Sequence, residues 1–407
     1  MKTIINRLII LVLILSGSAV KSQVFTNYTT VEGLPDNFII GGVAVDTNNN
    51  KWFGTAVGVA KFDDVNWTVY DTADGLVDNY TSCIAVDKNN NVWVGTNFGV
   101  SKFDGSAWTT YTTADGLIDN GVIYIAADID GSVWFATTAG VSKYDGVTWT
   151  DFTTTDGLPS NNIDYIAVDA AGNKWFGTVM GGVSMYDNST FTNISMATMD
   201  SLQDDNVFAV GIDNSGHKFI GTWYGISELD NANNWFANYD TASGLYNNYV
   251  RDIKVDSNDN VWVGLFADYN TQGGISKFDG STWTSYTMAD GLVDKQVIRL
   301  AVDKNNVVWI ATGNGVSKLQ DFSGITESNT DNTFRIFPNP ATDLLKVDIS
   351  GLPQEVTNIE IYNATQKVRE YSLNSNFGSI SIPVNELNAG MYFLRLGNSV
   401  EKFIITR

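Results

Sequence analysis

The chain of 407 residues carries 45 acidic and 24 basic residues, giving a formal net charge of −21, with one cysteine and one histidine. This acidic balance disfavours nucleic acids and anionic membranes as partners. A single cysteine excludes an internal disulfide. One cysteine and one histidine also offer no support for a Cys/His zinc site or a histidine-activated nucleophile.

Residues 1–22, MKTIINRLIILVLILSGSAVKS, combine a basic start, an apolar core over Leu8–Leu15 and an end of small residues. This pattern predicts a secretory signal peptide. The apolar run is too short for a membrane span, and no later segment approaches 18 apolar residues. We therefore expect no integral membrane segment in the mature chain.

One sequence pattern then returns seven times, most clearly as IAVDKNNNVWVGTNFGVSKFDGSAWTTYTTADGLIDN at residues 84–120. Its aromatic anchors follow one another at spacings of 41 to 47 residues: Trp52, Trp93, Trp134, Trp175, Phe219, Trp262 and Trp309. Four short strands per unit at this period are typical of propeller blades. Glycines such as Gly95 and Gly99 recur through the units, which favours turns over a phosphate-binding loop.

The fourth strand of the unit, WTTY at 108–111 in the second unit, is found in only six units. The seventh unit ends at 315–319 without one, whereas the segment VFTNYT at 24–29 matches it. We therefore predict an all-β fold, a seven-bladed β-propeller over residues 23–320 whose N-terminal strand closes the last blade. Closure of this kind removes an exposed sheet edge.

The repeated residues have a structural interpretation. Buried aromatic rings each remove a large apolar area from water, so the anchors are expected to pack between adjacent blades. One turn position is aspartate in every unit, and we expect these carboxylates to bond the turn backbone: Asp46, Asp87, Asp128, Asp169, Asp213, Asp256 and Asp303. His217 also occupies a turn position of the repeat.

After a polar linker at 321–332 the repeat disappears. Residues 333–407 read as short alternating strands separated by Gly, Pro and Asn, which predicts a small antiparallel β-sandwich. This tail holds seven acidic and seven basic residues, whereas residues 23–332 hold 38 acidic against 14 basic. The negative charge thus belongs to the propeller.

Both regions resemble known families. The repeats, through DGLxDN and IAVDxNNNxWxGTxxGVSKFDG, resemble the two-component-regulator propeller repeat over residues 24–320. The tail resembles the type A C-terminal sorting domain of type IX secretion, with a terminal Arg407 where such tails often end in lysine. The residues that carry this second resemblance include Pro338, Asn339, Pro340, Asp343, Gly390 and Tyr392.

The sorting-domain resemblance implies that residues 333–407 engage the type IX secretion machinery. The chain is then expected to pass through the periplasm and be secreted or attached to the outer surface of a Gram-negative bacterium, with removal of the tail. Propellers of the first family often form the sensing domain of membrane-bound hybrid histidine kinases, with polysaccharide fragments as frequent ligands. Because no kinase segment follows here, we carry over a binding role and not the signalling role.

Departures from the repeat indicate where a ligand would bind. The turn between the second and third strands and the link to the next blade are expected on one face, and aromatic side chains there are not required by the repeat. The candidate ligand-binding residues are Phe98, Trp223 and Tyr224 in such turns, Phe266, Asp268, Tyr269 and Asn270 in the expanded turn 264–274, and Tyr80 and Tyr246 in links.

We therefore predict a secreted or surface-displayed, non-catalytic propeller that binds glycan or peptide ligands, without metal, cofactor or catalytic residues. One alternative is a lyase or hydrolase acting on polysaccharides through carboxylates or tyrosines near the central channel. Another is a structural component of the surface or matrix. An open aromatic surface would favour binding, and a cluster of buried carboxylates outside the repeat would favour an enzyme.

Overall fold

A computed structural model describes residues 23–267, 271–321, 334–339, 341–348, 358–363, 367–372, 379–388, 390–396 and 399–406. The predicted signal peptide and most of the linker lie outside these residues, as do Asp268, Tyr269, Asn270 and Pro340 of the predicted sites. The chain divides into two compact units, Val24–Gln320 and a second one that contains Asp321–Arg407. Each unit is described by itself.

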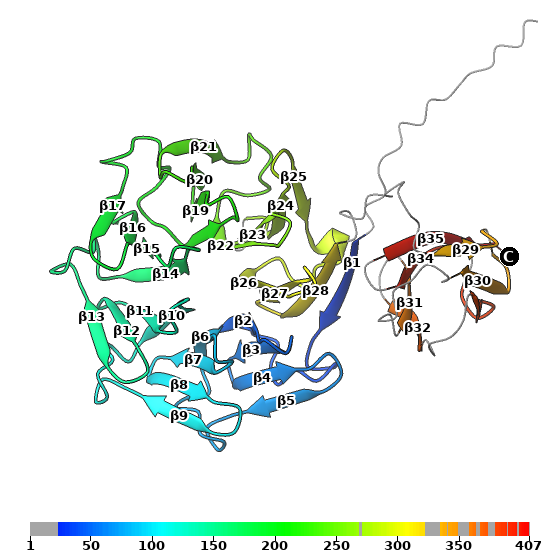
Figure 1. Ribbon diagram of the computed structural model, residues 1–407, viewed down its shortest axis with the longest axis horizontal. Helices are drawn as coiled ribbons and strands as arrows, with labels where there is room; N and C mark the ends of the chain where they lie inside the picture. Colours follow the sequence, from blue (N-terminus) through cyan, green and yellow to red (C-terminus); the bar gives the residue numbers. More distant parts are fainter. Residues whose placement is uncertain are drawn as a thin grey trace, which may run out of the picture. The chain divides into compact units, whose positions relative to one another are not determined.

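The first unit is a ring of seven four-stranded antiparallel sheets, the blades, and the blade numbers follow the chain (Figure 1). Blades one to three are β2 (Gly42–Val45), β3 (Lys51–Thr55), β4 (Gly58–Phe62) and β5 (Trp67–Tyr70); β6 (Thr81–Val86), β7 (Val92–Thr96), β8 (Gly99–Phe103) and β9 (Trp108–Tyr111); β10 (Val122–Ala127), β11 (Val133–Thr137), β12 (Val141–Tyr144) and β13 (Trp149–Phe152). Blades four to six are β14 (Ile163–Val168), β15 (Lys174–Thr178), β16 (Val183–Tyr186) and β17 (Phe191–Ile194); β18 (Ala209–Ile212), β19 (Lys218–Thr222), β20 (Gly225–Leu229) and β21 (Trp235–Tyr239); β22 (Val250–Val255), β23 (Val261–Leu265), β24 (Gly274–Phe278) and β25 (Trp283–Tyr286). The short 3-10 turn η1 (Met288–Asp290) follows blade six.

The seventh blade is built from both ends of the propeller sequence. Its sheet order is β1 (Gln23–Tyr28), β28 (Gly315–Asp321), β27 (Val308–Thr312) and β26 (Val297–Val302). The Ser317 hydroxyl donates to the Asn27 side chain at 2.7 Å, across 290 residues of sequence. The predicted seven-bladed ring and its closure by the N-terminal strand are both confirmed.

The aromatic anchors lie between blades, as predicted. None of the seven is more than 3% exposed. Trp93 of blade two, for example, contacts Phe135 of blade three with ring centroids 5.5 Å apart, and Trp309 of blade seven contacts Phe53 of blade one at 6.0 Å. This burial of large apolar area holds neighbouring blades together, and the last pair joins the two ends of the ring.

The turn aspartates bond the backbone as predicted, and they also bind the anchors. In blade two the Asp87 Oδ1 accepts from the backbone N–H groups of Asn89 and Asn91, both at 2.9 Å, and Oδ2 accepts from the Trp93 indole at 2.9 Å. The same aspartate–indole bond recurs in the five other blades that have a tryptophan anchor, at 2.9 to 3.3 Å. Each carboxylate therefore satisfies an indole that burial would otherwise leave without a partner.

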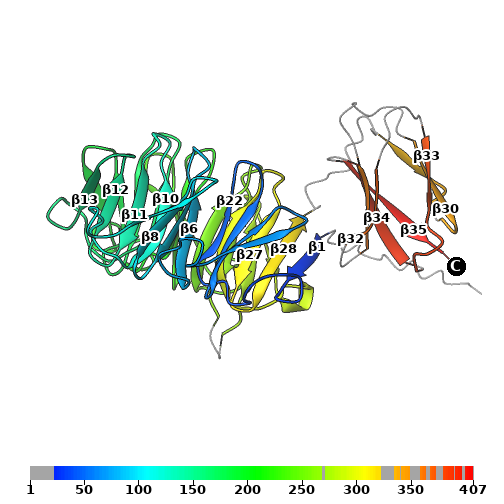
Figure 2. The same cartoon turned by 90° about the horizontal axis from the view of Figure 1, so that it is seen from below.

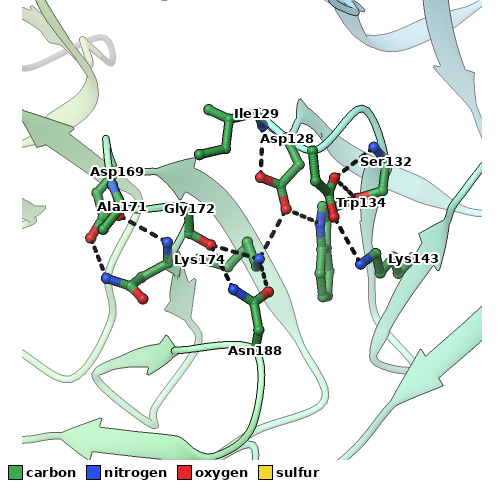
Figure 3. Close-up of polar contacts among 12 residues, drawn as sticks. Asp128, Ile129, Ser132, Trp134, Lys143, Asp169, Ala171, Gly172, Lys174 and Asn188 are labelled. Carbon is green, nitrogen blue, oxygen red and sulfur yellow. Dashed lines mark hydrogen bonds and ion pairs between the residues drawn. The ribbon is translucent and has the colours of Figure 1, made fainter.

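Blade three shares its turn aspartate, Asp128, with a buried lysine from blade four (Figure 3). Lys174 of blade four donates to Asp128 Oδ2 of blade three at 2.9 Å and to the Gly172 carbonyl and the Asn188 side chain. Its ammonium lies 4.9 Å from the centroid of the Trp134 ring. Lys51 is placed similarly over Trp309, at 4.9 Å, where blade one meets blade seven.

The second unit has two antiparallel sheets with a common core. One sheet is β29 (Arg335–Phe337), β30 (Leu344–Asp348) and β33 (Ser379–Pro383), and the other is β32 (Lys367–Ser372), β31 (Asn358–Tyr362), β34 (Gly390–Leu396) and β35 (Ser399–Ile405). Leu345, Val347 and Ile382 of the first sheet are buried in one cluster with Ile361 and Leu394 of the second. The two sheets pack face to face (Figure 2), so the predicted small sandwich is confirmed.

Candidate binding site on blades five and six

The turn between β19 and β20 presents two aromatic rings to solvent. Its Thr222 hydroxyl donates to the Gly225 carbonyl at 3.0 Å and accepts from the Tyr224 N–H at 3.0 Å, which closes the turn. Gly225 has φ +120° and lies against the Tyr239 carbonyl, so a side chain would clash there. The turn therefore holds Trp223 and Tyr224 outward, with exposed fractions of 50% and 63%.

The link from β21 to β22 lies beside this turn. Its Asn248 side chain accepts from the Thr241 N–H at 2.9 Å, and its Asn247 side chain donates to the carbonyls of Phe266 and Gln272 at 3.2 and 2.6 Å. The Phe266 N–H donates to the Tyr249 carbonyl at 2.8 Å. The link is thus fixed to the expanded turn after β23, which places turn and link on one face as predicted.

Turn and link together form an open pocket of about 330 Å³. Its lining residues are Trp223, Tyr224, Thr241, Asn247, Asn248 and Tyr249. Trp223 and Tyr249 meet edge to face with ring centroids 6.3 Å apart. The pocket therefore offers aromatic rings and neutral polar groups, and none of its six lining side chains carries a charge.

The inner side of Trp223 is covered. Its ring stacks on Phe208, with centroids 5.0 Å apart and an interplanar angle of 16°. Phe208 precedes β18 and is itself half-buried. This stacking fixes the orientation of Trp223 and leaves its outer face available to a ligand.

The structure gathers only part of the predicted set. Trp223 and Tyr224 line the pocket, and Phe266 contributes through its backbone contacts with the link. Tyr246 is 36% exposed in the same link but does not line the pocket, and Phe98 and Tyr80 are exposed on blade two and the link before it. Asp268, Tyr269 and Asn270 lie outside the described residues.

Three features of blades five and six were not predicted. Tyr249 occupies the repeat position of Tyr80, two residues after the aspartate or asparagine of the link, so its sequence did hold a signal. Phe208 lies in a strand-like segment, and nothing in its neighbours indicates the stacking on Trp223. The His217 backbone is in a turn as expected, but its Nδ1 contacts the buried Glu228 carboxylate at 2.5 Å.

The residues of the predicted sorting motif lie at or near the ends of strands in the second unit, and several of them make hydrogen bonds there. The Asn339 side chain accepts from the Ile404 N–H at 2.9 Å, and the Asp343 carbonyl accepts from the Val384 N–H at 2.8 Å. Pro338 is exposed, and Gly390 begins β34 opposite Ile405. Tyr392 is buried, with its hydroxyl donating to the Asn388 carbonyl at 2.9 Å.

The fold combines a repeat propeller with a small β-sandwich unit. Residues 335–406 match the family described as the secretion system C-terminal sorting domain, and residues 75–98 match the two component regulator propeller family. The chain thus carries a two-component-regulator propeller repeat and a type IX sorting domain. The sorting domain indicates secretion or surface display in a Gram-negative bacterium and interaction with the secretion machinery.

Solved structures share this fold at low sequence identity. The extracellular domain of the putative hybrid two component system BT3049 from B. thetaiotaomicron aligns with a TM-score of 0.64 and 19% identity, over 94% of this chain and 57% of that one. PorZ, a surface component of the type IX secretion system of Porphyromonas gingivalis, aligns at 0.59 and 18%, over 92% and 60%. A streptogramin B lyase aligns at 0.57 and 14%, over 74% and 98%.

The present chain therefore spans less than two thirds of the first two structures, and at these identities the likeness concerns the fold alone. A comparison with curated protein sequences finds no match. In the part of the chain that the structure describes, no helix has the length and apolar character needed to cross a bilayer.

Proposed function

We propose that the propeller is a non-catalytic binding module of an exported protein, and that it binds a neutral glycan in the pocket of Trp223, Tyr224 and Tyr249. The observation that carries this proposal is the pairing of exposed aromatic rings with amide and hydroxyl groups in one pocket. Sugar rings stack their C–H faces on aromatic side chains, while amides and hydroxyls bond the sugar hydroxyls. The pocket volume of about 330 Å³ lies at the lower end of the range for small-molecule sites.

The chemistry of the lining supports binding over hydrolysis. Glycosidases need two carboxyl groups that flank the scissile bond. None of the six lining side chains is a carboxylate. The absence of lining charges also favours a neutral ligand over an ionic one, because a charged group would lose hydration without gaining a partner.

A glycan and peptide array probed with residues 23–407 tests this proposal. We expect binding to neutral oligosaccharides, and a loss of at least tenfold when Trp223, Tyr224 and Tyr249 are all replaced by alanine. Phe98→Ala, which removes an equally exposed ring on the same face, is the matched control and should bind as the parent does. Binding to peptides alone, or undiminished binding by the triple variant, would contradict the proposal.

A further inference from the structure

The innermost strands of the ring depart from the repeat at one position. The residues paired with the glycine or alanine of each second strand are Gly42, Cys83, Tyr124, Tyr165, Ala209, Asp252 and Arg299 in blades one to seven. The small residues of three blades suffice for packing, so the four large polar ones call for another explanation. Their strands β10, β14, β22 and β26 surround the centre of the ring (Figure 1).

These side chains meet across the ring. The Tyr165 hydroxyl of blade four donates to Asp252 Oδ1 of blade six at 2.9 Å. Lys254, at a position that is alanine or glycine in the other blades, donates to the hydroxyls of Tyr165 and Tyr124 at 2.5 and 3.2 Å. Asp252 is fully buried, and its Oδ2 accepts from the Leu300 N–H at 2.7 Å. Tyr124, Tyr165, Asp252 and Lys254 therefore form a floor within the channel whose polar groups are partnered.

Three further charged groups adjoin this floor. Asp164 and Arg251 each precede a floor residue in sequence and lie one position nearer the face that carries the pocket. Arg299 lies with its guanidinium 5.3 Å from the centroid of the Tyr124 ring, and its Nη1 donates to the Arg251 carbonyl at 3.1 Å. Among the described residues, neither the Arg251 guanidinium nor the Asp164 carboxylate makes a hydrogen bond or ion pair. Arg251, Arg299 and Asp164 mark the mouth of the channel. Together with Asp252 and Lys254 of the floor they make three cations against two carboxylates.

Burial and mutual repulsion disfavour the charged forms of the groups at the mouth. Repulsion from Arg299 and partial burial lower the pKa of Arg251 to about 10. Burial raises the pKa of Asp164, although both arginines oppose this. A negatively charged group between the two guanidiniums would remove their repulsion and fill their unused donors, since arginine presents planar N–H pairs suited to oxyanions.

We infer that Arg251 and Arg299 form an oxyanion-binding site at the mouth of the channel, for the carboxylate of an acidic sugar or for a phosphate group. Asp164 accepts a hydrogen bond from a hydroxyl of the same ligand. The site adjoins the aromatic pocket, because Phe208 holds in blade five the repeat position of Asp164 and Arg251 and stacks on Trp223. The oxyanion site nevertheless stands on its own residues.

Calorimetric titration of residues 23–407 with galacturonate, inorganic phosphate and galactose tests the inference. We expect at least one of the two anions to bind, and the anion that binds identifies the source of the charge. Galactose, which lacks the oxyanion, should not bind at the arginines. Failure of both anions to bind at millimolar concentration would overturn the inference.

Variants separate this site from general charge effects. Arg251→Gln and Arg299→Gln should each weaken anion binding at least tenfold, whereas Lys304→Gln, which removes an exposed charge in the turn after β26, should not. The triple alanine variant of the aromatic pocket should keep its anion binding. Arg251→Gln removes one of two repelling charges, so we expect it to fold; equal anion binding by this variant and the parent would overturn the inference.

Discussion

Lys174 and Asp128 form a fully buried ion pair between blades three and four, with Nζ 2.9 Å from Oδ2 and side-chain exposures of 0% and 2%. Removing one partner of such a pair leaves an uncompensated buried charge, which costs about 3–5 kcal/mol. We expect Lys174→Ala to lower the free energy of unfolding by this amount, measured by urea denaturation. Lys174→Met, which keeps most of the volume, should lose less.

The control for this prediction is a surface pair in the same region. Lys143 and Asp130 lie 3.2 Å apart with side-chain exposures of 25% and 52%. Exposed pairs of this kind contribute about 0–1 kcal/mol. Lys143→Ala should therefore be nearly neutral, and equal losses for Lys143→Ala and Lys174→Ala would show that burial does not set the cost.

The aspartate–tryptophan bond predicts a difference between blades. Asp87→Ala leaves the Trp93 indole and two backbone N–H groups without their acceptor, and a buried unsatisfied donor costs about 1–3 kcal/mol. In blade five the anchor is Phe219, which has no indole N–H, so Asp213→Ala should cost less. Urea denaturation of the two variants measures the difference; a larger loss for Asp213→Ala would contradict the role assigned to the indole bond.

The single thiol, Cys83, can report whether the packing of blade two seen in the structure persists in solution. Burial raises the pKa of Cys83 to about 12, so the thiol stays protonated in the folded protein at pH 8.5. We expect no alkylation by iodoacetamide at this pH until urea unfolds the chain, as followed by mass spectrometry. Because the folded pKa lies above that of a free thiol, the stabilisation by the neutral group is complete below about pH 8.5 and declines as the pH rises toward 12. Rapid alkylation of the native protein would show that blade two is open.

Closure by β1 predicts the effect of a short deletion. Removing residues 23–28 leaves β28 as an exposed edge, and such edges pair with other chains. We expect the deletion variant to unfold at lower temperature and to form oligomers, measured by light scattering. Removal of residues 1–22 alone is the matched control and should leave a monodisperse, stable propeller. A deletion variant as stable as that control would mean that β1 adds nothing to blade seven.

The repeat made most of the fold predictable, whereas the site depends on distances that a repeat does not encode. Seven anchors at a nearly constant spacing indicate seven blades, and every anchor is buried where the pattern placed it. Trp223 and Tyr224 were predictable because they replace small turn residues. The floor of the channel was not predicted: Tyr124 and Lys254 are 130 residues apart, and they meet only because the ring closes.

The inner strand of blade six did hold a signal. Its sequence VRDIKV at 250–255 stands where blade two has TSCIAV at 81–86, so three charged side chains replace small ones. This change lies in a strand, outside the turns and links that carry the predicted ligand-binding residues. Substitutions on the inner strands of a propeller are therefore as informative as those in its turns.

Completion of blade seven by β1 also constrains how the protein can be made. A chain that leaves the ribosome or a membrane pore N-terminus first holds β1 without its partner until β28 has followed, nearly 300 residues later. Blade seven cannot be completed before that moment, so the ring of blades stays open until then. Final assembly of the propeller therefore depends on a strand of six residues at the opposite end of the repeat sequence.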